Sequence, residues 1–540
     1  MKNNGMRVTV YDTTLRDGTQ GEGVTFSVDD KLAVARKLDE IGVDYIEGGW
    51  PGSNPRDAEF FRRARSLKLE NARLSAFGST CHPRRRVEED PNLRALVEAE
   101  TPAVTIFGKS WGLHVEKALG SSLDKNLETI GASVAWLRDK GREVIYDAEH
   151  FFDGFAADPD YALATLQAAE GAGANWIVLC DTNGGTLTSR LAEVFSVVRR
   201  AVNADLGIHA HNDSELAVAN SIAAIECGAT QVQGTINGYG ERCGNANLCS
   251  VIPALELKLG RATIGPRRLA MLTAASRLVA ELANLPHPNQ LPFVGRSAFA
   301  HKGGVHVSAV MRDPATYEHI APELTGNSRR VLVSDLSGKS NILYKTAELG
   351  IDGAEADMQG LVTRIKELEH QGFQFEAAEG SLRVLIEQAL GNYRSPFALD
   401  GYHVSVERSS DGTQKCEATV RVELSGLLRE ASATGGGPVH ALDRALRRVL
   451  SNAFYSLNAV YLTDYKVRVL NGDKATAAKV RVLVDSSDGR HSWRTVGVSD
   501  NILDASLQAL EDAINYKLLC ESKNAEAQFD EAATEATNVV

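Results

Sequence analysis

The sequence predicts a (β/α)8 TIM barrel, followed by helical linker subdomains and a C-terminal α+β domain. At 540 residues the chain is too long for a single hydrophobic core. In its first half, short β-branched segments alternate with amphipathic helical segments, and the β-branched segments are almost continuously apolar. Such a pattern is typical of parallel strands that are buried on both faces. Eight repeats of this unit favour a barrel over a doubly wound sheet. The predicted strands cover residues 7–13, 43–49, 73–78, 103–108, 143–148, 176–182, 206–211 and 231–236.

The first predicted helix shows how the sequence sets the bounds of an element. Ser27 is placed to cap it, and the acidic Asp29 and Asp30 that follow are favoured by the helix dipole. Apolar residues then recur at helical spacing up to Ile41, and Gly42 is suited to end the helix.

The repeat ends near residue 260, and the texture of the chain changes twice after that. Residues 261–285 look helical, 285–292 are rich in proline, and 293–395 combine a loop containing His and Gly with helical stretches. Alternating segments at 403–408, 417–424, 466–471 and 478–485 flank candidate helices at 441–457 and 501–518, which is typical of antiparallel α+β structure. We therefore predict a barrel at 1–280, linker subdomains at 281–398, an α+β domain at 399–522 and a disordered tail at 523–540.

Composition excludes several classes of partner. The net charge is −12 and no basic stripe is present, which argues against nucleic acid or an anionic membrane. No apolar run approaches the roughly 20 residues that span a bilayer, and the N-terminus lacks the apolar core of a signal peptide. The seven cysteines are scattered and form no CxxC pair, so we expect reduced thiols and a cytoplasmic location.

Polar residues gather where the predicted strands end. The active site of a parallel barrel lies at the carboxyl ends of its strands, so these residues should share one rim. They are Asp12, Arg16, Asp17, Glu47, Glu149, Asp181, Thr182, His209, His211, Asp213, Glu241, Arg242 and Asn245.

A divalent-metal site is the sharpest local prediction. His209 and His211 are separated by one residue on a strand, so both imidazoles face the same way. With Asp17 and Asn245 they form a mixed nitrogen and oxygen set that suits Mg²⁺, Mn²⁺ or Zn²⁺ and leaves positions open for substrate. An isolated HxH is usually accidental; its place at the seventh strand end favours metal.

Arg16 suits a carboxylate or a developing enolate oxygen. Its neighbour in the chain, Asp17, also permits a simple ion pair that closes a loop. Glu47 fits two roles equally well, a functional group or a buried structural partner of Arg16.

Five motifs together resemble the 2-isopropylmalate/citramalate/homocitrate synthase family of metal-dependent barrels. They are YDTTLRDGTQ (11–20), IEGGWPGSNP (46–55), HAHND (209–213), GTINGYGERCGNANL (234–248) and AFAHKGGVH (298–306). They occur in family order, and the segment TGGGPVHALDRAL (434–446) resembles the family's regulatory domain. The GGWPGSNP form and the chain length are most similar to the long-type citramalate synthases.

This resemblance implies roles for individual residues. It makes Asp17, His209, His211 and Asn245 the metal ligands. Catalytic and substrate-facing roles fall to Arg16, Glu149 and Thr182, with Tyr317 near a segment that also contributes. His306 matches the family's proposed general base, which reaches a neighbouring subunit and so implies a homodimer.

The implied reaction is the condensation of acetyl-CoA with a small 2-oxo acid. Pyruvate as acceptor would serve isoleucine biosynthesis, and Phe107 and Tyr146 are candidates to fill the space that an isopropyl group would need. The nearest alternative is 2-isopropylmalate synthesis from 2-oxoisovalerate. A hydroxyacyl-CoA lyase is less favoured, because such lyases are single barrels without a domain like residues 400–520. A non-catalytic amino-acid sensor is less favoured, because the residues of the metal motif are intact. For the regulatory domain we expect isoleucine or leucine as effector.

Overall fold

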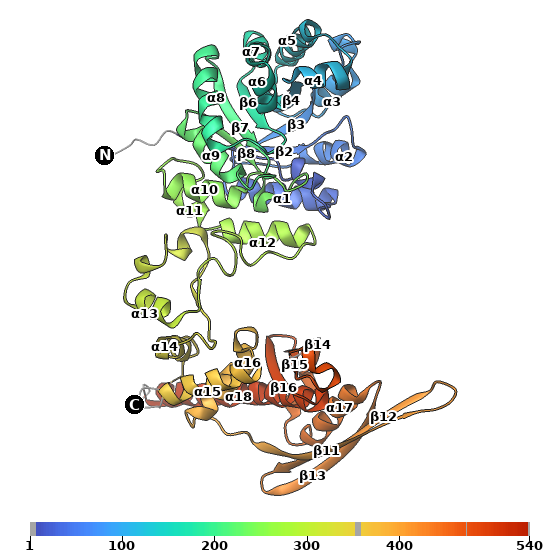
Figure 1. Ribbon diagram of the computed structural model, residues 1–540, viewed down its shortest axis with the longest axis vertical. Coiled ribbons are helices and arrows are strands. Elements are labelled where there is room, and N and C mark those ends of the chain that lie inside the picture. The colour runs from blue at the N-terminus through green and yellow to red at the C-terminus, as the bar shows by residue number, and fades with distance from the viewer. Residues whose placement is uncertain (1–6, 352–357, 471, 538–540) are drawn as a thin grey trace. The chain divides into compact units, whose positions relative to one another are not determined.

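The computed structural model describes residues 7–351, 358–470 and 472–537, and it divides into two compact units (Figure 1). The first unit contains the chain up to Phe299 together with His319–Arg329. The second unit contains Ala300–Glu318 and the chain from Arg330 onward. Among the described residues, no helix is both long and apolar enough to cross a lipid bilayer.

The first unit is a closed barrel of eight parallel strands, which confirms the predicted fold class. The strands are β1 (Thr9–Asp12), β2 (Tyr45–Gly49), β3 (Arg73–Ser79), β4 (Ala103–Lys109), β5 (Glu143–Glu149), β6 (Trp176–Asp181), β7 (Asp205–Ala210) and β8 (Gln231–Gly234). Each strand pairs with the next in the chain, and β8 pairs with β1 to close the sheet. All eight predicted strands are therefore present in the predicted order.

Helices surround the barrel and supply the outer half of its core (Figure 1). They include α1 (Val28–Glu40), α2 (Pro55–Ala64), α3 (Pro91–Glu98), α5 (Leu123–Asp139), α6 (Phe151–Ala157), α7 (Pro159–Gly171), α8 (Thr188–Ala201), α9 (Ala217–Glu226), α10 (Leu248–Leu257) and α12 (Leu272–Leu282). Side chains that point outward from the strands pack against these helices, whereas a smaller group, which includes Tyr11, Ile145 and Val178, fills the barrel interior.

The bounds of α1 confirm the local prediction. The backbone N–H of Asp30 donates to Ser27 Oγ at 3.2 Å, and the backbone N–H of Ser27 donates to Asp30 Oδ2 at 2.8 Å. This reciprocal capping box satisfies two helix-end donors. The helix ends just before Gly42, whose φ of +80° lies in the region that favours glycine.

The second unit combines helices with two open antiparallel sheets and a two-stranded parallel sheet of β9 (Ala300–His301) and β10 (Arg330–Val331). Its helical part contains α13 (Gly304–Arg312), α14 (Lys339–Glu348), α15 (Met358–Gln371) and α16 (Glu379–Ala389). One sheet contains β11 (Phe397–Arg408), β12 (Gln414–Leu424) and β13 (Leu427–Gly435), followed by α17 (Pro438–Leu450). The other contains β14 (Tyr461–Val469), β15 (Val480–Ser487) and β16 (Ser492–Ser499), followed by α18 (Ile502–Thr537).

Two features of this unit differ from the sequence prediction. Strands β13 and β16 were not among the predicted segments, because charged, small and glycine residues obscure their alternation. The backbone of residues 523–537, which we predict to be disordered, continues α18 as a helix. Its alanine- and glutamate-rich composition has high helix propensity. Residues 538–540 of the predicted tail lie outside the described residues.

Candidate active site

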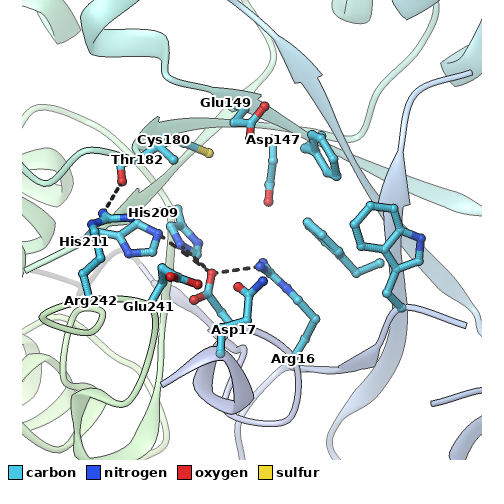
Figure 2. A pocket seen from close by; sticks show the side chains of 14 residues that line it. Arg16, Asp17, Asp147, Glu149, Cys180, Thr182, His209, His211, Glu241 and Arg242 are labelled. Atoms are coloured by element: carbon cyan, nitrogen blue, oxygen red, sulfur yellow. Dashed lines mark hydrogen bonds and ion pairs between the residues drawn. The ribbon is translucent and has the colours of Figure 1, made fainter. Parts of the chain in front are cut away.

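A pocket opens at the carboxyl ends of the barrel strands (Figure 2). Its volume is about 260 Å³. Its lining comes from every part of the predicted rim and consists of Arg16, Asp17, Gln20, Trp50, Phe77, Phe107, Asp147, Glu149, Cys180, Thr182, His209, His211, Glu241 and Arg242. The barrel thus brings together side chains that are more than 200 positions apart in the sequence.

Asp17, His209 and His211 form a compact cluster on one side of this pocket, which we call the metal-type cluster. Candidate ligand atoms of all three lie within 4.8 Å of one another, and all three residues are buried. Oδ2 of Asp17 lies 3.5 Å from Nε2 of His209 and 3.9 Å from Nε2 of His211. The amide nitrogen of Asn245 donates to Asp17 Oδ1 at 2.9 Å, so the fourth predicted residue borders the same cluster.

Two orphaned polar atoms make this cluster fit a cation. Nδ1 of His211 and Oδ1 of Asn245 are buried and have no hydrogen-bond partner among the described residues. An unsatisfied buried polar group costs about 1–3 kcal/mol. Metal coordination is one way in which histidine nitrogen and amide oxygen atoms are satisfied. The donor set of imidazole, carboxylate and amide oxygen therefore suits a divalent ion.

The protonation states of Asp17 and His211 favour metal binding, whereas Asp17 outweighs burial and raises the pKa of His209. Burial, reinforced by the nearby His209, lowers the pKa of His211 to about 4, which leaves its imidazole neutral at pH 7. Burial alone would raise the pKa of Asp17, but the adjacent Arg16 guanidinium outweighs that effect and holds it well below its ordinary value. A neutral imidazole and an ionised carboxylate are the forms that coordinate metals.

Arg16 is fixed beside this cluster by two carboxylates and an aromatic ring. Its Nε donates to Glu47 Oε2 at 2.5 Å and its Nη1 to Asp17 Oδ2 at 2.8 Å. The guanidinium carbon lies 3.7 Å from the ring centroid of Phe77. Burial would lower the pKa of Arg16, but Glu47 and Asp17 outweigh it and raise the value, so this side chain stays cationic.

Glu47 is a structural partner of Arg16. It is fully buried, and it does not belong to the pocket lining. The hydroxyls of Tyr11 and Thr13 donate to its two oxygens at 2.6 Å and 2.5 Å. Of the two roles that the sequence left open for Glu47, the geometry favours the positioning of Arg16.

Glu149 and Thr182 also line the pocket, at the ends of β5 and β6, and Thr182 lies beside His211 and Arg242 (Figure 2). Glu149 forms an ion pair with Lys109. Thr182 Oγ1 accepts a hydrogen bond from the backbone N–H of His150 at 2.9 Å, and its carbonyl accepts one from Arg242 at 2.7 Å. Both predicted residues therefore face the same cavity as the metal-type cluster.

Of the two residues expected to fill the acceptor space, Phe107 lines the pocket and Tyr146 does not. The placement of Tyr146 was wrong because side chains alternate along β5. Ile145 belongs to the interior cluster and Asp147 to the pocket, whereas Tyr146 packs in the outer core between strands and helices.

Several pocket residues were missed from the sequence. Asp147 is buried and lies two positions before Glu149, so strand alternation was the signal that could have revealed it. Trp50 and Phe77 join Phe107 in an aromatic wall, with ring centroids 5.6 Å apart for Trp50–Phe107 and 5.4 Å for Phe77–Phe107. The indole N–H of Trp50 donates to Asn92 at 2.7 Å, which holds the ring in place.

His306 and Tyr317 belong to the second unit, whereas every pocket residue belongs to the first. Their rings stack with centroids 4.2 Å apart. Both side chains are exposed. Nearby, His301 Nε2 lies 3.0 Å from Glu318 Oε1, and both of these residues are buried. The roles of His306 and Tyr317 therefore stay predictions.

Comparisons with known proteins agree over most of the chain. The HMGL-like family model matches residues 7–279, the model described as homocitrate synthase post-HMGL domain-like matches 293–372, and the LeuA allosteric (dimerisation) domain model matches 376–518. (R)-Citramalate synthases of Aquifex aeolicus and Geobacter sulfurreducens are 52% and 54% identical over 95% of this chain, and the matches cover 98% and 97% of those proteins. The chain belongs to the (R)-citramalate synthase family. A probable 2-isopropylmalate synthase of Methanopyrus kandleri is more distant, at 34% identity over 94% of this chain and 98% of that protein.

Proposed function

We propose that this chain is an (R)-citramalate synthase that condenses acetyl-CoA with pyruvate and hydrolyses the thioester to release citramalate and CoA. The observation that carries the proposal is identity of 52–54% over 94–95% of the chain to three proteins with that name. The identity to the named 2-isopropylmalate synthase is 34%. The pocket contains the acid, cation and imidazole groups that such a condensation needs.

In this proposal Asp17, His209, His211 and Asn245 hold one divalent ion, Mg²⁺, Mn²⁺ or Zn²⁺. The ion supplies Lewis acidity toward the 2-oxo acid when it is bound. The side chains fit this role because they are buried and close together, and because Asp17 is held ionised and His211 neutral, as ligands must be. Four protein groups would hold the ion, fewer than the six ligands that Mg²⁺ or Mn²⁺ takes, so substrate oxygens could complete its coordination.

Arg16 orients the acceptor and stabilises the negative charge that develops on its carbonyl oxygen. Its guanidinium faces the pocket next to Asp17 and keeps its charge at all physiological pH values. Because Glu47 and Phe77 hold it from behind, it needs no rearrangement during the reaction. Glu149 and Thr182, which also line the pocket, bind the acceptor.

His306 is the proposed general base, with Tyr317 as its neighbour. An unprotonated imidazole nitrogen has a lone pair that can take a methyl proton from acetyl-CoA. The resulting carbanion forms the new carbon–carbon bond with C2 of pyruvate, and the ketone oxygen becomes a hydroxyl after protonation. Water then attacks the thioester carbonyl, the C–S bond breaks and CoA leaves as the thiol.

The aromatic wall supports pyruvate as the acceptor. Trp50, Phe77 and Phe107 form one wall of the cavity, and we propose that these bulky rings face the acceptor's side chain and disfavour a branched one. Each additional carbon that is excluded or accepted is worth about 1–3 kcal/mol. This proposal therefore expects a preference for pyruvate of at least about 10-fold in kcat/KM.

The decisive experiment measures CoA release from acetyl-CoA with pyruvate and with 2-oxoisovalerate, in the presence of Mg²⁺ or Mn²⁺. Faster release with pyruvate supports citramalate synthesis. Faster release with 2-oxoisovalerate would contradict it and assign 2-isopropylmalate synthesis to the same pocket. Release with neither acid would contradict both.

For the second unit we propose a homodimer that is inhibited by isoleucine, in a cytoplasmic enzyme of isoleucine biosynthesis. The match of residues 376–518 to an allosteric and dimerisation domain supports the first two points. All seven cysteines are free, which suits a reducing compartment. Titration of isoleucine and leucine against CoA release tests the effector, and indifference to both would contradict regulation by these amino acids.

A further inference from the structure

The metal-type cluster has a second set of contacts on the side of His209 that faces away from Asp17. His209 is at the end of β7, and its Nδ1 lies 2.9 Å from Oε1 of Gln233 on β8. Both residues are buried, and Gln233 is fully so. Gln233 does not line the pocket, so it acts on the site only through other side chains.

The orientation of the Gln233 amide is fixed by two oxygen atoms. Its Nε2 donates to Asp147 Oδ1 at 3.2 Å and to Gln231 Oε1 at 3.3 Å. A reversed amide would turn its oxygen toward these two acceptors and lose both bonds. Asp147 lies on β5, which is not a neighbour of β8 in the sheet, so this chain of bonds crosses the barrel interior.

This orientation determines which nitrogen of His209 carries the proton. The amide oxygen of Gln233 can only accept, so Nδ1 of His209 must donate to it. The neutral imidazole then has its lone pair on Nε2, the atom that lies 3.5 Å from Asp17 Oδ2. Ligating histidines commonly donate their other ring N–H to an oxygen that fixes tautomer and ring orientation.

We propose that Gln233, anchored by Asp147, is a positioning residue that holds His209 in the tautomer whose Nε2 binds the divalent ion. The inference rests on the metal-dependent function proposed above. It concerns a bond network that connects three strands of the barrel, β5, β7 and β8.

Metal affinity of the Gln233 variants tests this role. Co²⁺ is titrated into the apo protein and followed by its visible absorption. Gln233→Met has a similar length but no acceptor, so we expect Co²⁺ to bind about 10- to 100-fold more weakly. Gln233→Glu retains an acceptor for the Nδ1 proton but loses the donor to Asp147 and Gln231, so we expect its affinity for Co²⁺ to lie between that of the wild type and that of Gln233→Met. A role in packing alone predicts the opposite order, because methionine is apolar and a new buried carboxylate beside Asp147 is unfavourable.

Gln231→Met is the matched control. Gln231 has the same residue type, faces the same way on β8 and is also fully buried. Its loss removes one of the two oxygens that orient Gln233 and leaves the Asp147 bond in place. We expect a change in Co²⁺ affinity of less than about threefold. A loss equal to that of Gln233→Met would overturn the proposal.

A measurement on the wild type covers the case in which Gln233→Met does not fold. In protein labelled with ¹⁵N-histidine and loaded with Zn²⁺, the His209 resonances should show a protonated Nδ1 and a coordinated Nε2. Coordination of the ion through Nδ1 of His209 would refute the proposed role of Gln233. Failure of the proposed function would be seen separately. The Gln233 and Gln231 variants would still show the expected Co²⁺ affinities, but the wild type would release no CoA with pyruvate.

Discussion

The two compact units bury their strands in opposite ways. In the barrel, every residue of β2 and β8 is buried, because each strand has neighbours on both sides and packs against helices outside and side chains inside. In the second unit, β13 has no buried residue at all, and it lies at the edge of an open sheet. A closed sheet is complete within one chain, whereas an open sheet retains an exposed face and exposed edges. This difference is consistent with chemistry in the barrel and association in the second unit.

The largest expected effect tests whether the second unit is only an association domain. His306→Ala should reduce kcat about 10²- to 10⁴-fold, because a general base contributes that much. Metal binding should be unchanged, since every residue of the proposed ligand set belongs to the barrel unit. Steady-state CoA release and Co²⁺ titration measure the two quantities. His403→Ala, an exposed histidine of β11, is the control. Turnover of His306→Ala near that of wild type would reject the assigned base and leave catalysis to the barrel unit.

The converse experiment removes a ligand from the barrel. His211→Ala should weaken divalent-metal affinity by at least about 100-fold. Loss of a residue that only hydrogen-bonds a metal ligand costs about 10- to 100-fold, and loss of the ligand itself should cost more. Dimerisation and isoleucine binding, if they belong to the second unit as proposed, should be unaffected. Metal analysis and sedimentation velocity test the separation, and undiminished metal content would refute the assignment of His211.

Exposed leucines offer a matched test of the association surface. Leu427 and Leu428 of the second unit are 58% and 60% exposed, and Leu187 beside α8 of the barrel is 62% exposed. Burial of a leucine side chain is worth about 1.5–3 kcal/mol, so a charge at Leu427 or Leu428 should weaken the proposed dimer about 10- to 100-fold.

Leu187→Glu is the control, with no expected change. Sedimentation equilibrium of Leu427→Glu, Leu428→Glu and Leu187→Glu measures the dissociation constants. Equal behaviour of all three variants would show that neither Leu427 nor Leu428 takes part in association.

The smallest expected effect concerns local stability in the barrel. Ser27→Ala removes the side chain that caps α1 and should lower the stability of the barrel unit by about 1 kcal/mol. The N-cap residue of α17 in the second unit is Gly437, which has no side chain, so this helix has no capping hydrogen bond that corresponds to that of Ser27. Calorimetry should show a lower barrel transition and an unchanged transition for the second unit. A shift of both transitions would mean that the units unfold together.

The alternation of side chains along β5 explains why the prediction for Glu149 agrees with the structure and the prediction for Tyr146 does not. Side chains at 145, 147 and 149 point inward and those at 146 and 148 point outward, so Glu149 was placed correctly on the pocket while Tyr146 was not. Applied strictly, the same rule would have found Asp147. In the C-terminal sheets the rule is weaker. No residue of β13 is buried, and it carries charged and small residues, whereas β16 has four consecutive buried residues and so no inward–outward alternation.

The sequence by itself determined the barrel, the order of its strands and the residues that stand at their ends, because apolar periodicity and capping are local properties of the chain. It also identified the HxH pair, since two residues on one strand face the same way without help from the rest of the fold. Only the tertiary structure decided that Glu47 supports Arg16, that an aromatic wall faces the metal-type cluster, and that Gln233 links His209 to Asp147. Those relations join different strands, and the bond between Gln233 and Asp147 crosses the barrel interior. Closure of the sheet, which no local pattern encodes, sets their distances.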